Sequence, residues 1–215
     1  MAIYQPGSRV WKAKGCARDG HANQFYNIEP SNMERTKLSG VPQFAQWAEI
    51  NQTDKFTCIE PLSGFRHIVR EDEGYRIYLE PEASERAIGE ALLDVLGRSR
   101  VVSPIDEREF FEADRIMRNH RAWHEDFMKR YRYKTKREAY KNMRYCEVER
   151  KDGKISIQPH KRDFKPGLWW DLPPEKTVVI PETNDPGIVG AAAALALSHC
   201  EFCSITFPPK SPAAR

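Results

Sequence analysis

The fold expected for this chain is decided by the stretch Tyr75-Arg76-Ile77-Tyr78-Leu79-Glu80-Pro81 and the residues 82–100 that follow it. Aromatic and branched residues favour a strand over residues 75–79. Ser84 can cap a helix after the Pro-Glu turn. Apolar residues then recur at helical spacing and form one stripe: Ala87, Ile88, Ala91, Leu92, Val95 and Leu96. The pattern predicts a strand, a turn and an amphipathic helix in succession.

A second stretch has the same order of features. It consists of Thr177-Val178-Val179-Ile180-Pro181-Glu182, followed by residues 183–200, in which Asp185-Pro186 is a favourable helix start. Aligning Gly89 with Gly190 places Ile88 on Val189, and the later apolar positions also match. We therefore expect two similar strand–turn–helix units. They predict a scaffold only, because neither carries a nucleophile, a carboxylate pair or a metal-binding cluster.

Shorter elements are expected between these units. Asp106 and Glu109 form an Asp variant of the capping box, which predicts the start of a long helix. A short helix is expected after Thr135, and Asp152-Gly153 predicts the turn of a hairpin between residues 144–149 and 154–158. The order of elements indicates an α/β fold, or alternatively α+β, with a small central sheet and packed helices.

The chain divides into three parts on these grounds. Residues 1–70 predict an irregular segment with short strands over 56–60 and 65–69 and a short helix over 41–50. Residues 71–203 form the main domain, and the prolines of residues 204–215 predict a frayed tail. The longest apolar run, residues 188–197, predicts a helix buried on every side.

Composition suits a soluble globular protein, with 30% charged and 40% apolar residues. No apolar run reaches the roughly 20 residues that a membrane helix needs, so no membrane partner is expected. Residues 1–11 do not resemble a signal peptide. The odd number of cysteines indicates reduced thiols, and we therefore expect a cytoplasmic protein. They are Cys16, Cys58, Cys146, Cys200 and Cys203.

Charge is unevenly distributed around a net value of +3. Residues 71–114 hold 13 acidic and 5 basic residues, a balance of −8, whereas residues 128–165 hold 5 acidic and 14 basic residues, a balance of +9. Two solvated faces would explain this asymmetry, and so would a dipolar surface that steers a charged partner.

Two pairs of residues have spacings found in metal or redox sites. His120 and His124 lie four residues apart on the expected long helix, but zinc would need further ligands. The favoured alternative places His120 beside the apolar stripe of the helix and His124 in contact with water. Cys200 and Cys203 have Cys-x-x-Cys spacing but follow a helix, where the dipole disfavours a thiolate. We predict no metal, cofactor or catalytic residue.

Residues 129–145 interleave cations with tyrosines. This composition is typical of surfaces that bind phosphates and stack bases. It is also typical of a helix junction with buried tyrosines and solvated lysines. No Gly-x-Gly-x-x-Gly motif and no serine nucleophile elbow accompanies the segment. The residues alone therefore indicate no enzyme, and nucleic-acid binding stays an alternative function.

Several of these segments together resemble the immunity proteins of bacterial contact-dependent growth inhibition (CDI) systems. The resemblance covers roughly residues 75–203, and Arg132 stands where a small residue, usually glycine, is expected. The segments that carry it are Tyr78-Leu79-Glu80-Pro81, Ile88-Gly89-Glu90-Ala91-Leu92, Phe110-Phe111, Tyr133-Lys134-Thr135-Lys136, Ile155-Ser156-Ile157-Gln158-Pro159 and Ile188-Val189-Gly190-Ala191-Ala192.

The resemblance implies a non-enzymatic inhibitor in the bacterial cytoplasm. Its partner would be the cognate C-terminal toxin domain, often a nuclease, with no direct nucleic-acid binding and no small-molecule cofactor. A nuclease surface is basic because it attracts phosphates, so an acidic patch on the inhibitor would speed association. The expected toxin-binding residues are Glu107, Glu109, Glu112 and Asp114.

Overall fold

The structure, a computed structural model, describes residues 44–65, 67–72, 74–103, 108–163 and 165–203 of the chain. Within these ranges one sheet runs in the order β3-β2-β1-β5-β6-β7, while β4 pairs with β2 and both β8 and β9 pair with β6. The strands are β1 (Ala45–Gln52), β2 (Thr57–Gly64), β3 (Ile68–Arg70), β4 (Ile77–Leu79), β5 (Arg144–Lys151), β6 (Lys154–Arg162), β7 (Trp169–Asp171), β8 (Val178–Pro181) and β9 (Glu201–Phe202).

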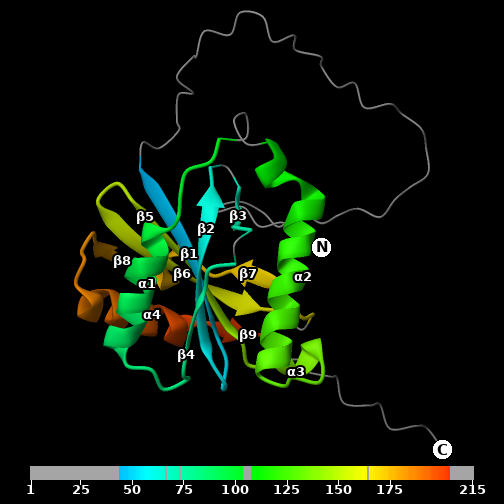
Figure 1. Ribbon diagram of the computed structural model, residues 1–215. Helices are drawn as coiled ribbons and strands as arrows, with labels where there is room; N and C mark the ends of the chain where they lie inside the picture. Colours follow the sequence, from blue (N-terminus) through cyan, green and yellow to red (C-terminus); the bar gives the residue numbers. More distant parts are fainter. Residues whose placement is uncertain (1–43, 66, 73, 104–107, 164, 204–215) are drawn as a thin grey trace, which may run out of the picture.

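Four α-helices and two 3₁₀ turns flank the described sheet. The helices are α1 (Glu85–Gly97), α2 (Ala113–Arg130), α3 (Lys136–Tyr140) and α4 (Pro186–His199), and the turns are η1 (Arg108–Phe111) and η2 (Pro174–Lys176). Helices α1 and α4 lie on one side of the sheet and α2 lies on the other (Figure 1). None of these helices is both long and apolar enough to cross a membrane.

The sheet is antiparallel, so the fold is α+β and not the α/β fold that was our first expectation. Each of the strand pairs from β1–β2 to β6–β8 is antiparallel, and only the short β6–β9 pair among the described strands is parallel. The β5–β6 hairpin was predicted correctly. Its turn residues Asp152 and Gly153 have φ values of 51° and 71°, as a type I′ turn requires.

The short helix expected over residues 41–50 is wrong, because β1 occupies the described part of that segment. Trp47 and Ala48 lie on opposite faces of β1, which pairs with β2 on one side and β5 on the other. The strands expected over 56–60 and 65–69 are present as β2 and β3, with β2 longer and β3 shorter and later than expected. The boundary expected at residue 70 therefore falls between strands of one sheet. The tail over 204–215 lies outside the described residues.

Both predicted strand-to-helix connections are present. The Ser84 hydroxyl accepts a hydrogen bond from the Ala87 backbone N–H at 3.2 Å, and the Asp185 carboxylate accepts one from Gly187 at 2.8 Å. α1 and α4 then pack closely through glycine. A Cβ on Gly190 would lie 1.7 Å from the Glu85 carbonyl oxygen. The similarity of the two units as copies stays a prediction.

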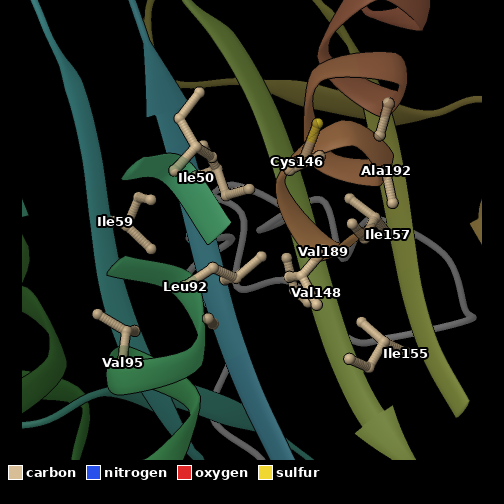
Figure 2. Close-up of a cluster of buried hydrophobic side chains, with 14 of the residues drawn as sticks. Ile50, Ile59, Leu92, Val95, Cys146, Val148, Ile155, Ile157, Val189 and Ala192 are labelled. Atoms are coloured by element: carbon tan, nitrogen blue, oxygen red, sulfur yellow. The ribbon is translucent and has the colours of Figure 1, made fainter. Parts of the chain in front are cut away.

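The main core lies between the sheet and helices α1 and α4 (Figure 2). The α1 stripe was predicted correctly, since Ile88, Ala91, Leu92, Val95 and Leu96 are buried there. Helix α4 is not buried on every side, because Ile188 is 51% exposed and Leu195 is 50% exposed. The expectation was wrong because only one face of α4 meets the sheet and α1. The sheet residues in this core are Ala48, Ile50, Ile59, Cys146, Val148, Ile155 and Ile157.

The long helix begins later than predicted. Asp106 lies outside the described residues, Phe110 is buried in η1, and α2 begins at Ala113 without a side-chain cap from Glu112. The short α3 helix lies after Thr135 as predicted, and the Thr135 hydroxyl caps it by accepting a hydrogen bond from the Glu138 N–H at 3.1 Å. An aromatic cluster joins α2 and α3 to the sheet and includes Phe56, Trp123, Phe127, Tyr133 and Tyr140.

Candidate functional site

A row of carboxylates crosses the sheet on the face opposite α1 and α4. Glu49 in β1 lies directly opposite Glu60 in β2 and directly opposite Glu147 in β5. All three are buried, with exposed fractions of 4%, 2% and 8%. Like charges on adjacent strands repel one another, and burial of a charge is costly unless it is paired. We call these three residues the carboxylate row.

Two arginines partly neutralise the carboxylate row. Arg70 donates to Glu49 and also places its Nε 3.1 Å from a Glu60 oxygen. Arg76 lies 3.6 Å from the other Glu60 oxygen and 3.4 Å from Asp126. Burial raises the pKa of Glu60 to about 8, although the Arg70 charge opposes this shift. Protonation of Glu60 near neutral pH therefore reduces the repulsion within the row.

A cavity of about 250 Å³ separates the polar face of the sheet from α2. Glu49 and Glu147 lie on its sheet side, while Trp123 and His120 line it from α2. Tyr145 donates to Glu147 at 2.6 Å and so satisfies one carboxylate oxygen. The site thus combines carboxylates with aromatic walls, and Arg70 supplies the cation that faces both, because its guanidinium also lies 4.3 Å from the centroid of the Trp123 ring.

His120 and His124 lie together on α2, and His124 is buried, so the expectation that it faces water is wrong. Their rings stack with centroids 4.9 Å apart, and the Tyr140 hydroxyl lies 2.7 Å from His124 Nε2. Burial lowers the pKa of His120 to about 4 and that of His124 to about 3, so both rings are neutral near pH 7. No set of three or more metal-ligating residues gathers in the described ranges. The pair belongs to the aromatic cluster.

Comparison with known proteins identifies the family to which this architecture belongs. The family described as CDI immunity protein, CdiI, matches residues 46–200. The chain belongs to this family. The immunity protein CdiI-YPIII of Yersinia pseudotuberculosis serotype O:3 is 27% identical over 169 residues, which cover 72% of this chain and 95% of that protein.

Two solved structures share the CdiI fold described above. One is a CdiA-CT/CdiI toxin and immunity complex from Yersinia pseudotuberculosis, with a TM-score of 0.67. The other is a protein of unknown function from Neisseria meningitidis, with a TM-score of 0.68. Each match has 26% identity and covers 74% of this chain and 98% of the other chain. The family resemblance inferred from the sequence is confirmed.

Three of the four acidic residues expected to bind a toxin lie in the part of this CdiI protein that the structure describes. Glu107 lies outside the described residues, whereas Glu109, Glu112 and Asp114 are exposed around η1 and the start of α2. Glu109 and Glu112 line one surface hollow with two further acidic residues and four arginines. The other charged residues of this hollow are Glu71, Asp72, Arg100, Arg108, Arg115 and Arg118.

Ion pairs reduce the negative charge of that hollow. Arg115 Nε lies 2.8 Å from Asp72, and Arg100 Nε lies 2.9 Å from Glu71. Burial raises the pKa of the Asp72 carboxyl, but hydrogen bonds from Arg115 and Asn119, together with the Arg115 charge, outweigh it, so the net pKa is lowered. The surface is therefore mixed in charge rather than uniformly acidic.

The tyrosines of segment 129–145 are held within the protein. Tyr131 stacks on Phe56 with ring centroids 4.4 Å apart, while Tyr133, Tyr140 and Tyr145 are buried. Exposed cations remain on the surface of the segment. These rings are not available to stack nucleic-acid bases, and this geometry favours the interpretation as a helix junction.

Sequence reasoning missed both the carboxylate row and one cysteine pairing. The alternation of Trp47, Glu49 and Asn51 with apolar residues is the signal that could have located β1 and its polar face. Cys200 lies 3.6 Å from Cys146, sulfur to sulfur, although the sequence suggested Cys203 as its neighbour. No local spacing indicates the pairing with Cys146, because it depends on how α4 returns to the sheet.

Proposed function

We propose that this CdiI protein neutralises the C-terminal toxin domain of a CDI system by binding it, in the bacterial cytoplasm and without chemistry of its own. The observation that carries the proposal is the match to the CdiA-CT/CdiI complex, which spans 98% of the aligned chain and 74% of this one. The described residues form one continuous sheet with helices on both sides. This architecture provides a rigid surface for a partner.

The toxin, in this proposal, is a nuclease. A nuclease must attract phosphates and therefore has a basic surface, to which exposed carboxylates bind. Glu109, Glu112 and Asp114 supply such carboxylates at the start of α2, and Glu107 precedes them in the sequence. Their contribution is to the rate of association, because exposed charges steer diffusion more than they stabilise the complex. The arginines of the same hollow reduce this contribution, because they add positive charge beside these carboxylates.

Co-expression with the toxin domain encoded immediately upstream tests the main proposal. We expect a stable one-to-one complex in size-exclusion chromatography with light scattering, and loss of the toxin's cleavage of DNA or RNA when the purified chain is added. Absence of a complex would contradict the proposal. Retention of the isolated chain on nucleic acid that falls with rising salt would instead support the alternative use of segment 129–145.

Charge reversal tests the proposed surface separately. Glu109, Glu112 and Asp114 are changed to lysine together, and a control variant carries lysine at the exposed positions Glu80, Glu82 and Glu175. Both variants gain the same net charge. At low salt, we expect at least about a tenfold slower association with the toxin for the first variant only. Equal association rates for the two variants would show that these carboxylates do not face the toxin.

A further inference from the structure

We propose that Cys146 and Cys200 are a thiol pair that small-molecule disulfides oxidise to a reversible intramolecular disulfide, which joins β5 to the end of α4. This modification site is independent of the toxin interface proposed above. Cys146 belongs to the apolar face of β5, and its side chain points toward α4 (Figure 2). Cys200 is the C-cap residue that directly follows His199, the last residue of α4.

The geometry brings the two sulfurs into contact. Cys146 Sγ and Cys200 Sγ lie 3.6 Å apart, within hydrogen-bond distance for sulfur. A disulfide needs about 2.05 Å, so the sulfurs must approach by about 1.5 Å. Cys200 follows the last helical turn and has an extended backbone, with φ −58° and ψ 139°. A small change in the backbone of Cys200, which would bring the two sulfurs together, therefore does not break the hydrogen bonds of a complete helical turn.

The surroundings give the two thiols different roles. Cys146 is fully buried, whereas Cys200 is only partly buried at the edge of the core. The hydrogen bond from Cys146 lowers the pKa of Cys200 to about 7, against the opposing effect of burial. Burial raises the pKa of Cys146 well above its usual value. Cys200 is therefore the attacking thiolate, and Cys146 is the thiol that resolves the intermediate.

The reaction balances with a small-molecule disulfide as the oxidant. The Cys200 thiolate attacks one sulfur of the reagent, which forms a mixed disulfide and releases one thiolate. The released thiolate accepts the proton of Cys146, and the Cys146 sulfur then attacks Cys200. This second step forms the Cys146–Cys200 bond and expels the second reagent thiolate. Two protein thiols are oxidised by two electrons, and the reagent is reduced to two thiols.

The other described cysteines are placed less favourably for this reaction. Cys58 is buried on the opposite face of the sheet, in the aromatic cluster. Cys203 is partly buried and follows β9, and its backbone N–H donates to the Arg162 carbonyl oxygen at 2.9 Å, which holds it beside the end of β6. The competing product is therefore a Cys200–Cys203 disulfide, the one suggested by sequence spacing alone.

Oxidation should stabilise the fold. The cysteines are 54 positions apart, so the disulfide would close a long loop in the unfolded chain and remove much of its conformational freedom. We expect the melting temperature of the oxidised protein to rise by roughly 5–10 °C. The rise should disappear on reduction with dithiothreitol.

The test uses the full chain and oxidised glutathione. Peptide mapping without reduction is expected to give one Cys146–Cys200 crosslinked peptide, together with the increase in melting temperature. Cys200→Ser should abolish both, whereas the matched control Cys203→Ser should leave both unchanged. A lasting glutathione adduct on Cys200, a Cys200–Cys203 crosslink or no reaction would overturn the proposal. Peptide mapping of the unsubstituted chain tests the Cys146–Cys200 disulfide directly, even where a variant fails to fold.

Discussion

The two faces of the sheet are built from the same strands but are stabilised in different ways. The face toward α1 and α4 has an apolar centre, and residues such as Ile50, Ile59 and Val148 are buried there. The face toward α2 holds the carboxylate row, two arginines and a cavity. Burial of apolar surface stabilises the first face, whereas the second retains charged groups that are costly to bury.

This difference bears on stability. A buried ion network is weak support for stability, because apolar residues of similar volume often stabilise a fold as well or better. The apolar face therefore contributes most of the stability, and the polar face carries the buried groups whose protonation depends on pH. Changes on the apolar face should alter the free energy of unfolding most. Changes on the polar face should alter its pH dependence.

The largest expected effect concerns the contact between α1 and α4. Gly190→Ala should lower the free energy of unfolding by about 3 kcal/mol, because the new Cβ would lie 1.7 Å from the Glu85 carbonyl oxygen and the helix backbones would have to separate. Gly89→Ala should cost a similar amount, since its Cβ would lie 1.8 Å from the Pro186 carbonyl oxygen. Urea denaturation measures both.

Gly97→Ala is the matched control for these two variants. Gly97 ends α1, and no atom lies within 4 Å of the position that its Cβ would take. Alanine there should be neutral or stabilise by about 0.5 kcal/mol through helix propensity. If Gly190→Ala unfolded at the same urea concentration as Gly97→Ala, the close packing of the two helices would be refuted.

The next effect concerns Glu60 and has a definite sign. The raised pKa, about 8 in the folded protein, means that the folded state retains the proton of Glu60 longer than the unfolded state. The resulting stabilisation is complete below about pH 4.5 and is lost as pH rises through about 8. Glu60→Gln mimics the protonated carboxyl, so this variant should lose less stability than the natural chain between pH 5 and 8.5, by on the order of 1–2 kcal/mol.

Denaturation at several pH values measures this difference, with Glu82→Gln on the exposed surface as the control for loss of one carboxylate. The buried histidines act with the opposite sign. The lowered pKa values of His120 and His124 give a contribution that is present above about pH 6.5 and is lost as pH falls toward 4. The histidine effect and the Glu60 effect can be separated, because Glu60→Gln removes only the second. Parallel pH profiles for Glu60→Gln and the natural chain would rule out a raised pKa for Glu60.

The sequence predicted the apolar face far better than the polar face. The α1 stripe, its Ser84 cap, the Asp185 cap and the Asp152-Gly153 turn follow from local patterns, because each depends on residues a few positions apart. β1 was mistaken for a helix because Phe44, Trp47 and Ala48 are spaced as they would be on one helical face. Pairing with β5, which is distant in the sequence, decides this segment in favour of a strand.

The carboxylate row could not be predicted for the same reason. It exists only because the registers of β1 with β2 and of β1 with β5 place Glu49 opposite both Glu60 and Glu147. A shift of one residue in either register would move the side chains to opposite faces. Long-range register is not encoded in any short window of sequence. The contact between Cys146 and Cys200 is non-local in the same way.

The smallest expected effect lies in the turn that follows α2, beside the polar face. Arg132 has a φ of 54°, the left-handed conformation that glycine adopts most easily. Its N–H donates to the Lys129 carbonyl oxygen at 3.3 Å, and the Tyr133 N–H donates to that of Met128 at 3.0 Å, which together form a Schellman motif. Family resemblance predicted a small residue at this position, and the structure supplies the physical reason.

Arg132→Gly should therefore raise the free energy of unfolding by about 0.5–1 kcal/mol, because relief of the left-handed strain exceeds the added flexibility of the unfolded chain. Lys134→Gly is the matched control, since Lys134 is also exposed but is not among the residues with positive φ. This control should lose a few tenths of a kcal/mol, on the order of the entropic cost of glycine. A loss of stability in Arg132→Gly as large as in Lys134→Gly would mean that the arginine side chain itself stabilises the turn. The turn would then differ in kind from the glycine turn expected for the family.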